Sequence, residues 1–225
     1  MSRKNSLFIT LEGGEGAGKT TLLEKLQQAL SEKGYEVVAT REPGGTKLGN
    51  MIRKILLNRD IDCSIGNYTE LMLFLAARTQ HIEELIEPAL EAGKIVICDR
   101  FNDSTIAYQG AARDLGVDKV EQQCFLACHG VLPELTFFLD LNPEIGLERT
   151  KKINKDSAPQ GTVDRIEAEK MQFHQKVRSA IQQIAVKEHE RILTIDAERP
   201  AEEVFTVALK KITETLLNKG ITANV

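Results

Sequence analysis

Residues 7–26 read LFITLEGGEGAGKTTLLEKL, and this stretch decides the fold. Apolar residues of strand length lead into a glycine-rich loop, and helix-forming residues follow the loop directly. Within the loop, Gly13-x4-Gly18-Lys19-Thr20 has the spacing of a phosphate-binding P-loop. Glycines let backbone N–H groups converge on phosphate oxygens, the start of the helix adds positive potential, and the lysine reaches the outer phosphates. The stretch predicts a nucleoside triphosphate site, and a chance glycine-rich turn is the less favoured interpretation.

The loop also predicts the kind of nucleotide. The residues expected to bind it are Gly13, Gly14, Glu15, Gly16, Ala17, Gly18, Lys19, Thr20 and Thr21. The Thr20 hydroxyl is in addition a candidate ligand of Mg²⁺. A guanine-binding protein would carry Asn-Lys-x-Asp, and the nearest string, NKDS at residues 154–157, lacks the fourth residue. We therefore expect ATP rather than GTP.

Strand-length apolar runs alternate with amphipathic stretches of helical length along the whole chain. Strands are expected at Ser6–Leu11, Glu36–Thr40, Lys94–Cys98, Leu135–Leu141 and Arg191–Ile195. Helices are expected at Lys19–Lys33, Thr46–Asn58, Asn67–Glu91, Ser104–Tyr108 with an irregular continuation, Lys119–His129, Pro143–Ile153, Val163–Glu188 and Ala201–Asn218. The pattern predicts an α/β protein with the three-layer P-loop NTPase fold, in which helices flank a five-stranded parallel sheet. A chain of 225 residues, 42% of them apolar, suits a single domain spanning residues 1–225.

One segment differs from the rest of the chain in composition. Residues 151–162 read KKINKDSAPQGT and are polar, with lysine, aspartate, serine, proline and glycine between two expected helices. Such a composition predicts a mobile surface loop. Loops of this kind often cover an active site, so we expect a short lid over about residues 151–165.

Composition excludes several classes of protein. The formal net charge of −4 argues against a broad nucleic-acid surface, which would be basic overall or strongly striped. No stretch approaches the roughly 20 apolar residues of a membrane span, and no signal-peptide core follows the first residues, so we expect a cytoplasmic protein. Cys98 lies in an apolar run, and Cys63, Cys124 and Cys128 have no histidines at zinc-like spacing, which favours incidental thiols over a metal site.

A second cluster of polar residues follows the third expected strand. Residues 99–110 read DRFNDSTIAYQG. Ligands bind beyond the carboxyl ends of the strands in such a sheet, so Asp99 and Arg100 should lie beside the P-loop. Asp99 could hold Mg²⁺ through water, and Arg100 could form paired hydrogen bonds with a phosphate. A structural salt bridge is the alternative for this pair.

Five strings occur in a fixed order along the chain: LEGGEGAGKTT, TREPGGT, LFLAAR, DRFNDSTIAYQG and DRIE. With them the sequence resembles bacterial thymidylate kinases over essentially its whole length. The P-loop alone indicates only a superfamily, whereas TREPGGT together with DR…DS..AYQG is highly specific. The resemblance implies phosphorylation of dTMP to dTDP with ATP and Mg²⁺, as a step of dTTP synthesis. It also implies a homodimer, with no sign in the sequence of which surface pairs.

The resemblance assigns residues to the dTMP phosphate and base. Arg53 and Arg100 match the arginines that bind the phosphate, which carries about −1.5 to −2 charges at neutral pH. Arg41 and Pro43 belong to the TREPGGT loop over this pocket, although a structural ion pair is nearly as well supported for Arg41. Phe74 and Arg78, four residues apart on one helix face, match the ring that stacks on thymine and the donor to its 4-oxo group. An ordinary core position is the alternative for Phe74.

The remaining substrate residues are also implied by the resemblance. Thr105 and Gln109 would lie near the base, with Ser104 grouped beside them on the same helix. Tyr108 would lie under the deoxyribose, where its ring would crowd a 2′-hydroxyl group. Glu15 would lie by the sugar 3′-hydroxyl group. A carboxylate so close to ATP phosphates is electrostatically costly, which favours a functional reason for it.

Four residues are expected to act in catalysis: Lys19, Asp99, Arg100 and Arg165. Bacterial relatives often carry several arginines in the lid, whereas residues 151–162 contain only lysines, so Arg165 of the DRIE string is the candidate for stabilising the transferring phosphoryl group. Arg149 is the alternative. A phosphate oxygen of dTMP is already a nucleophile, so no general base is needed and Asp99 is expected to organise Mg²⁺ and the arginine. A kinase for another nucleotide or a deoxynucleoside, and an ATP-binding regulator, remain the rival interpretations.

Overall fold

The sheet of this protein has five parallel strands in the order β2-β3-β1-β4-β5. The computed structural model describes residues 5–59, 63–157 and 164–223, without the side chains of residues 153–157. The strands are β1 (Leu7–Gly13), β2 (Val37–Arg41), β3 (Ile95–Asp99), β4 (Leu135–Asp140) and β5 (Ile192–Asp196). The α/β class, the parallel sheet and all five expected strands are confirmed, with ends that differ by one or two residues.

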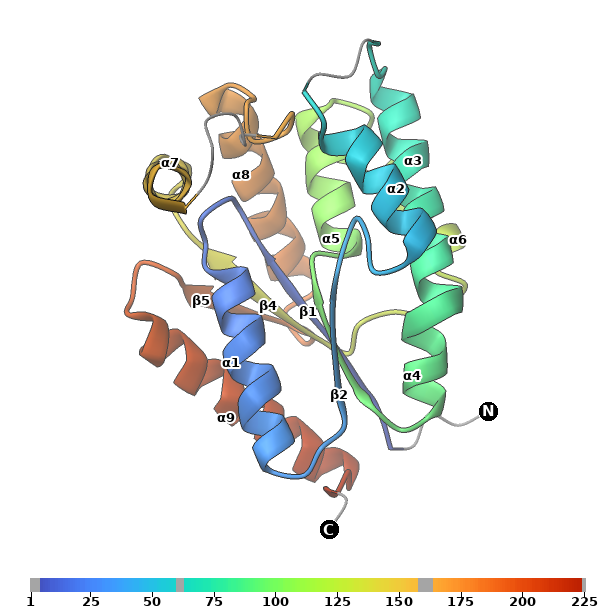
Figure 1. Cartoon of the computed structure of the whole chain (residues 1–225), viewed down its shortest axis with the longest axis vertical. Helices are drawn as coiled ribbons and strands as arrows, with labels where there is room; N and C mark the ends of the chain where they lie inside the picture. Colours follow the sequence, from blue (N-terminus) through green and yellow to red (C-terminus); the bar gives the residue numbers. More distant parts are fainter. Residues whose placement is uncertain (1–4, 60–62, 158–163, 224–225) are drawn as a thin grey trace.

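Helices cover both faces of this sheet and form a three-layer arrangement (Figure 1). One face is covered by α1 (Lys19–Glu32) and α9 (Ala201–Lys219). The other face is covered by α4 (Glu87–Glu91), α5 (Asn102–Thr105) and α8 (Met171–Lys187). Farther from the sheet lie α2 (Lys47–Leu57), α3 (Asn67–His81) and α6 (Val117–Ala127), and α7 (Pro143–Ser157) lies beside the turn between β1 and α1.

Side chains of β1 alternate between the two halves of the core. Leu7, Ile9 and Leu11 are fully buried against α1 and α9, whereas Phe8 is buried on the opposite face with Val96 and other residues near α4. Because successive side chains of a strand point to opposite faces, a strand covered on both sides must be apolar throughout. The continuous apolar runs of the sequence follow from this burial.

Two wide π-helical turns interrupt the helices. The expected helix Asn67–Glu91 is helical throughout but contains the π turn η1 (Ile82–Ile86), in which the Glu87 N–H bonds to the Ile82 carbonyl. Pro88 has no N–H and its ring would clash with the carbonyl four residues earlier, which accounts for a wider turn here. The second, η2 (Ile106–Ala112), continues α5 and is the irregular continuation expected after Tyr108. Such turns often occur at functional sites.

The structure corrects the boundaries around the expected lid. The helix expected at Pro143–Ile153 continues as far as Ser157, so residues 154–157 are helical rather than part of a loop, while residues 158–163 lie outside the described residues. Lysine and glutamate favour helix, and Lys152 forms an i,i+4 ion pair with Glu148 at 2.9 Å. The expected helix Val163–Glu188 begins only at Met171, because Asp164 accepts the N–H groups of Ile166 and Glu167 and stabilises a turn.

The four cysteines are all free thiols. Cys98, Cys124 and Cys128 are buried and Cys63 is exposed. Within residues 5–59, 63–157 and 164–223, no group of three histidine, cysteine or acidic side chains is arranged to hold a metal ion. In the same part of the chain, no helix combines the length and apolarity needed to cross a membrane.

Candidate active site

The P-loop begins where β1 leaves the sheet, between β3 and β4. This is the switch point of an open parallel sheet, where ligands bind beyond the strand ends. Gly16 packs directly against the start of α7, and a Cβ atom on Gly16 would lie 2.2 Å from the Gly146 carbonyl oxygen. Lys19 Nζ donates to the carbonyl oxygens of Gly13 at 3.1 Å and Gly14 at 2.8 Å. The buried ammonium group is thus held against the loop that is built to bind phosphates.

Asp99 and Thr20 meet beside this loop. The Thr20 hydroxyl donates to Asp99 Oδ2 at 3.3 Å, and Asp99 Oδ1 is buried without a hydrogen-bond partner among the described residues. Carboxylate and hydroxyl oxygens are hard ligands that suit Mg²⁺, which commonly keeps several waters. A buried carboxylate oxygen that no protein group satisfies fits such a hydrated cation.

Arg100 connects the P-loop to the segment after β3. Its guanidinium donates to Glu15 Oε1 at 2.5 Å, to the Gly13 carbonyl at 2.9 Å and to Ser104 Oγ at 3.4 Å. The same group lies over the Tyr108 ring at 5.1 Å, and the Tyr108 hydroxyl donates to Glu15 Oε1 at 3.3 Å. Arg100 is thereby aimed at the loop that would hold the donor nucleotide.

The ion pair between Glu15 and Arg100 holds both groups in their charged forms. Burial alone would raise the pKa of Glu15, but Arg100 and Lys19 lower it below its ordinary value. Burial would likewise lower the pKa of Arg100, but the negative charge of Glu15 raises it above its ordinary value.

Glu12, near the end of strand β1 and directly before the P-loop, fixes the backbone that carries Arg100. This fully buried carboxylate accepts the Phe101 N–H at 2.8 Å and the Ser104 hydroxyl at 2.5 Å. Burial, with a further contribution from Asp103, raises the pKa of Glu12 to about 7. Arg100 itself has a φ of 68°, a conformation that few residues other than glycine adopt without such support.

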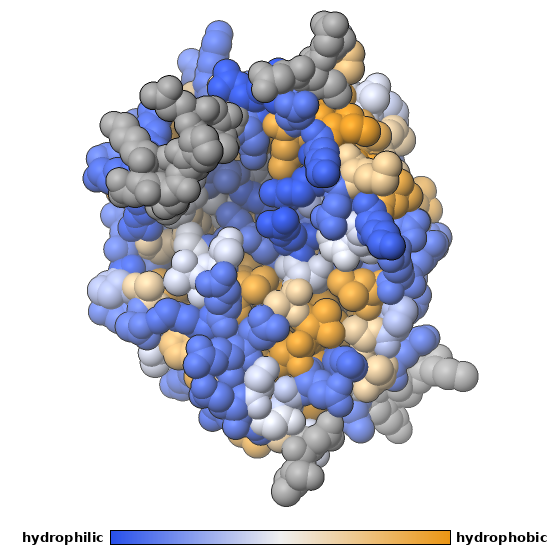
Figure 2. Space-filling view, in the orientation of Figure 1, coloured by the Kyte–Doolittle hydropathy of each residue, from blue (hydrophilic) through white to orange (hydrophobic). Residues whose placement is uncertain are grey.

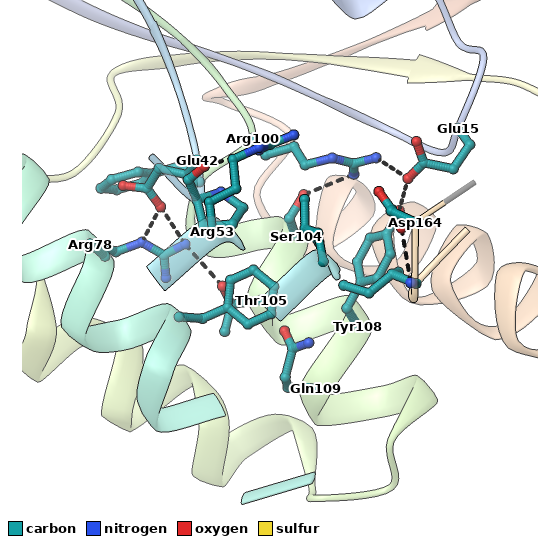
Figure 3. Close-up of a pocket in the computed structure, with 15 residues that line it drawn as sticks. Glu15, Glu42, Arg53, Arg78, Arg100, Ser104, Thr105, Tyr108, Gln109 and Asp164 are labelled. Atoms are coloured by element: carbon teal, nitrogen blue, oxygen red, sulfur yellow. Dashed lines mark hydrogen bonds and ion pairs between the residues drawn. The ribbon is translucent and has the colours of Figure 1, made fainter. Parts of the chain in front are cut away.

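A cavity beside the P-loop collects most of the expected dTMP residues. Its lining includes Glu15, Pro43, Arg53, Phe74, Arg78, Arg100, Ser104, Thr105, Tyr108 and Gln109, all of them predicted from the sequence, together with Glu42, Leu57, Phe101, Asp164 and Ile166. Figure 3 shows Glu15 and Arg100 toward one end of this cavity and Arg78 toward the other. A larger cavity over the P-loop shares Glu15, Glu42, Arg53 and Arg100 with it. The two cavities therefore meet at a pair of arginines.

Each end of the first cavity has its own polar groups. At the far end, Arg78 is buried, donates from Nε to Glu42 Oε2 at 2.7 Å and from Nη2 to Thr105 Oγ1 at 2.9 Å, and lies over the Phe101 ring. At the end shared with the P-loop cavity, Arg53 Nη1 donates to the Pro43 carbonyl at 2.9 Å. Arg41 is exposed at the end of β2. It lines the P-loop cavity but not the first cavity. Phe74 is half-buried and faces the first cavity.

Arg165 and Arg149, the two arginines weighed for the transferring phosphoryl group, are bonded elsewhere. Arg165 pairs with Glu70 through Nη2, donates from Nε to the Leu56 carbonyl at 2.9 Å, and lines neither cavity as they are formed by the described residues. Glu70 also accepts from Gln109 Nε2 at 2.8 Å. Arg149 Nη1 donates to the Ala197 carbonyl at 3.1 Å and lines a third cavity beside the P-loop.

Comparison with known protein families gives a match: the family model described as thymidylate kinase covers residues 11–207 of this chain. The chain belongs to the thymidylate kinase family. A thymidylate kinase of Protochlamydia amoebophila is 58% identical over 207 residues, 92% of each chain. One of Geobacillus thermodenitrificans is 45% identical over 212 residues, 94% of this chain and 92% of its own.

A solved structure shows the same likeness in three dimensions. The crystal structure of thymidylate kinase from Ehrlichia chaffeensis has a TM-score of 0.71 and 33% identity, covering 93% of this chain and 99% of its own. The resemblance to bacterial thymidylate kinases and the P-loop kinase fold are thus confirmed. The family reaction is the phosphorylation of dTMP, with ATP as phosphoryl donor.

Sequence reasoning missed three acidic residues of the site: Glu12, Glu42 and Asp164. Each stands next to or within a string that the sequence analysis quoted, so their positions were available. The roles of Glu12 and Glu42 were not, because these carboxylates act on residues distant in the chain. Glu42, for example, meets Arg78 across 36 positions. Asp164 instead accepts from the N–H groups of Ile166 and Glu167, two and three residues along the chain.

Proposed function

We propose that the chain transfers the γ-phosphoryl group of ATP to the 5′-phosphate of dTMP, giving dTDP and ADP for dTTP synthesis. One observation carries this assignment most strongly: the P-loop cavity and the cavity lined by Phe74 and Arg78 share Arg53 and Arg100. Two phosphate-bearing ligands bound in these cavities would bring their phosphates together at these arginines. In-line phosphoryl transfer requires this juxtaposition.

The donor would bind along the P-loop. Backbone N–H groups of residues 13–21 and the start of α1 would hold the phosphates, and Lys19 would turn from the Gly13 and Gly14 carbonyls onto them. Thr20 and Asp99 would hold Mg²⁺, which supplies charge neutralisation on the donor phosphates. The third cavity, lined by Gly18, Thr21 and Arg149, adjoins the P-loop and suits the adenosine part of ATP.

The acceptor would bind with its phosphate toward Arg53 and Arg100, and Arg41 would add positive charge nearby. The base would then lie between Phe74 and the Arg78 end of the cavity, near Thr105 and Gln109. Tyr108, fixed by its hydrogen bond to Glu15, would lie under the sugar. A phosphate pocket at one end and an uncharged base pocket at the other favour a monophosphate over a free nucleoside.

Catalysis would rest on positioning and charge. The phosphate oxygen of dTMP is the nucleophile and needs no base, so the residues that matter are those that neutralise the moving group. Arg100 lines both cavities, and Lys19 lines the P-loop cavity. Arg165 remains a candidate for this role, and it would have to leave Glu70 to perform it. A lid over residues 151–165 would exclude water that otherwise hydrolyses ATP.

We also propose a homodimer formed through α2, α3 and α6. Exposed apolar side chains follow helical spacing on these neighbouring helices: Leu48, Met51 and Ile55 on α2, Tyr68 and Met72 on α3, and Phe125 and Leu126 on α6. Figure 2 shows hydrophobic residues gathered over α2 and α3. Contiguous apolar surface of this kind commonly marks a protein interface. Free thiols and the consumption of ATP both agree with a cytoplasmic location. We assign the whole chain to one catalytic domain.

Release of ADP in the presence of different acceptors tests the function. We expect kcat/KM to fall in the order dTMP, dUMP, dCMP, with dGMP and thymidine near background. Loss of one methyl group changes burial by only about 0.8 kcal/mol, so dUMP should remain detectable. dCMP would place an amino donor against the Arg78 donor and should be far poorer. Preference for thymidine or a purine nucleotide would contradict the assignment, and no acceptor dependence would favour an ATP-binding regulator.

A further inference from the structure

Glu42 lies in the loop between β2 and α2 and holds two buried side chains of α3. Its Oε2 accepts from Arg78 Nε at 2.7 Å, and Arg78 Nη2 lies 2.7 Å from the same oxygen. Its Oε1 lies 3.0 Å from His81 Nδ1, and His81 Nε2 lies 2.7 Å from Thr40 Oγ1. Glu42 is 5% exposed, and Arg78 and His81 are at most 1% exposed. Both carboxylate oxygens are therefore fixed inside the protein.

The surrounding packing leaves this chain of contacts little freedom. Gly45 stands against His81, and a Cβ atom there would lie 2.2 Å from His81 Nε2. On the other side, the Arg78 guanidinium lies 4.8 Å from the centre of the Phe101 ring and donates to Thr105. The plane of the guanidinium is thus set by its hydrogen bonds to Glu42 and Thr105 (Figure 3), with the Phe101 ring against its face.

Of the three arginines that line the cavity, Arg78 and Arg100 are paired with carboxylates and Arg53 is not. Arg78 is paired with a carboxylate, so it offers hydrogen-bond donors without a net charge. In the described part of the chain, Arg53 has no carboxylate within ion-pair distance and bonds to the Pro43 carbonyl. A phosphate gains most from an uncompensated cation, whereas an uncharged carbonyl is best matched by donors whose charge is neutralised. The cavity is therefore electrically asymmetric.

We propose that Glu42 is a specificity-determining residue that acts through Arg78. By fixing the guanidinium and neutralising it, Glu42 makes the Arg78 end of the cavity accept an uncharged carbonyl group and leaves the phosphate to the Arg53 end. This inference rests on the proposed function, since the carbonyl group is taken to be the 4-oxo group of thymine. Without Glu42, the guanidinium can turn and donate to the ring nitrogen or 2-oxo group of cytosine.

The test compares Glu42→Ala and Glu42→Gln with wild type, using kcat/KM for dTMP and for dCMP together with the melting temperature. We expect the dTMP-to-dCMP ratio to fall at least tenfold in Glu42→Ala, mainly through a higher KM for dTMP. Glu42→Gln keeps an oxygen that can accept the Arg78 Nε hydrogen and should retain more of the ratio. Asp103→Asn is the matched control, because Asp103 is equally buried and its partner is Arg191, remote from the base.

A merely structural role for Glu42 would lower the melting temperature and the activity toward both nucleotides in proportion. An unchanged dTMP-to-dCMP ratio in both Glu42 variants, or an equal fall of the ratio in Asp103→Asn, would overturn the inference. Failure of the proposed function has a different signature, because wild type itself would then show no preference for dTMP.

Discussion

At the scale of single residues, Arg100 offers a direct test of the phosphate site. Three of its hydrogen bonds go to groups of the site, namely Glu15, Gly13 and Ser104. We expect Arg100→Ala to lower kcat about a hundredfold or more, because a charged hydrogen bond used in the transition state is lost. Glu15 keeps access to solvent, so the melting temperature should change little. Arg191→Ala, which breaks the buried pair with Asp103, is the control and should destabilise without this loss of turnover.

Glu12 predicts a measurable dependence of stability on pH. Its pKa is about 7 in the folded chain against 4.5 as the reference value, so the folded chain binds this proton more tightly. The free energy of unfolding must therefore fall as pH rises from about 4.5 to about 7, by up to about 3 kcal/mol from this group. Glu12→Gln keeps an acceptor for Phe101 N–H and removes the charge. Its stability relative to wild type should be greater at pH 8 than at pH 5, as measured by denaturant unfolding.

A constant difference between Glu12→Gln and wild type across this pH range would show that Glu12 stays charged in the folded chain. The comparison of the two proteins cancels the titration of all other groups that the substitution leaves alone.

The sequence motifs predicted which side chains surround the cavity, but not which hydrogen-bond partners those side chains have. Helical spacing and the family likeness were enough to gather Phe74, Arg78 and Tyr108 at one site, and all three line the same cavity. The carboxylates that orient the arginines were not predictable, because those pairs join elements far apart in sequence. The DRIE string marked Arg165 as a catalytic candidate, but it gave no sign that the Arg165 guanidinium pairs with Glu70.

At the scale of elements, the turn after α7 carries Arg165, whose proposed catalytic role can be tested directly. We expect Arg165→Ala to lower kcat much more than it raises the KM for dTMP, since the proposed contact strengthens as charge develops. Steady-state kinetics of Arg165→Ala and Arg149→Ala in parallel provide the measurement. A large loss in Arg149→Ala with near wild-type Arg165→Ala would reverse the assignment. Lower stability with normal kcat would mean that Arg165 only anchors the turn to Glu70.

Strands could be predicted because burial on both faces makes them apolar throughout, and long helices because burial of one face imposes a period on the sequence. The π turns could not, since a widened turn has no period of its own and only Pro88 marks the first of them. The α7 boundary failed for another reason: lysine and aspartate suggest a loop by composition, but the same lysines support a helix through ion pairs such as Glu148–Lys152.

At the scale of the whole molecule, the apolar face of α2, α3 and α6 predicts the oligomeric state. Met51 is 63% exposed at the centre of the α2 stripe. We expect wild type to elute with twice the chain mass by size exclusion with light scattering, and Met51→Lys to shift toward the monomer because a charge would be buried at the interface. Leu217→Lys on α9 is the control, as Leu217 is 73% exposed but lies outside this face. A dimer that tolerates Met51→Lys would place the interface elsewhere.

Whether this chain phosphorylates dTMP is decided by following the γ-phosphoryl group itself. ATP with a radioactive γ-phosphate is incubated with the protein, Mg²⁺ and either dTMP or thymidine, and the labelled products are separated. We expect label in dTDP, formed in equal amount to ADP, and no labelled product from thymidine. Label that appears in free phosphate whichever acceptor is present, or in a product of thymidine, would contradict a thymidylate kinase.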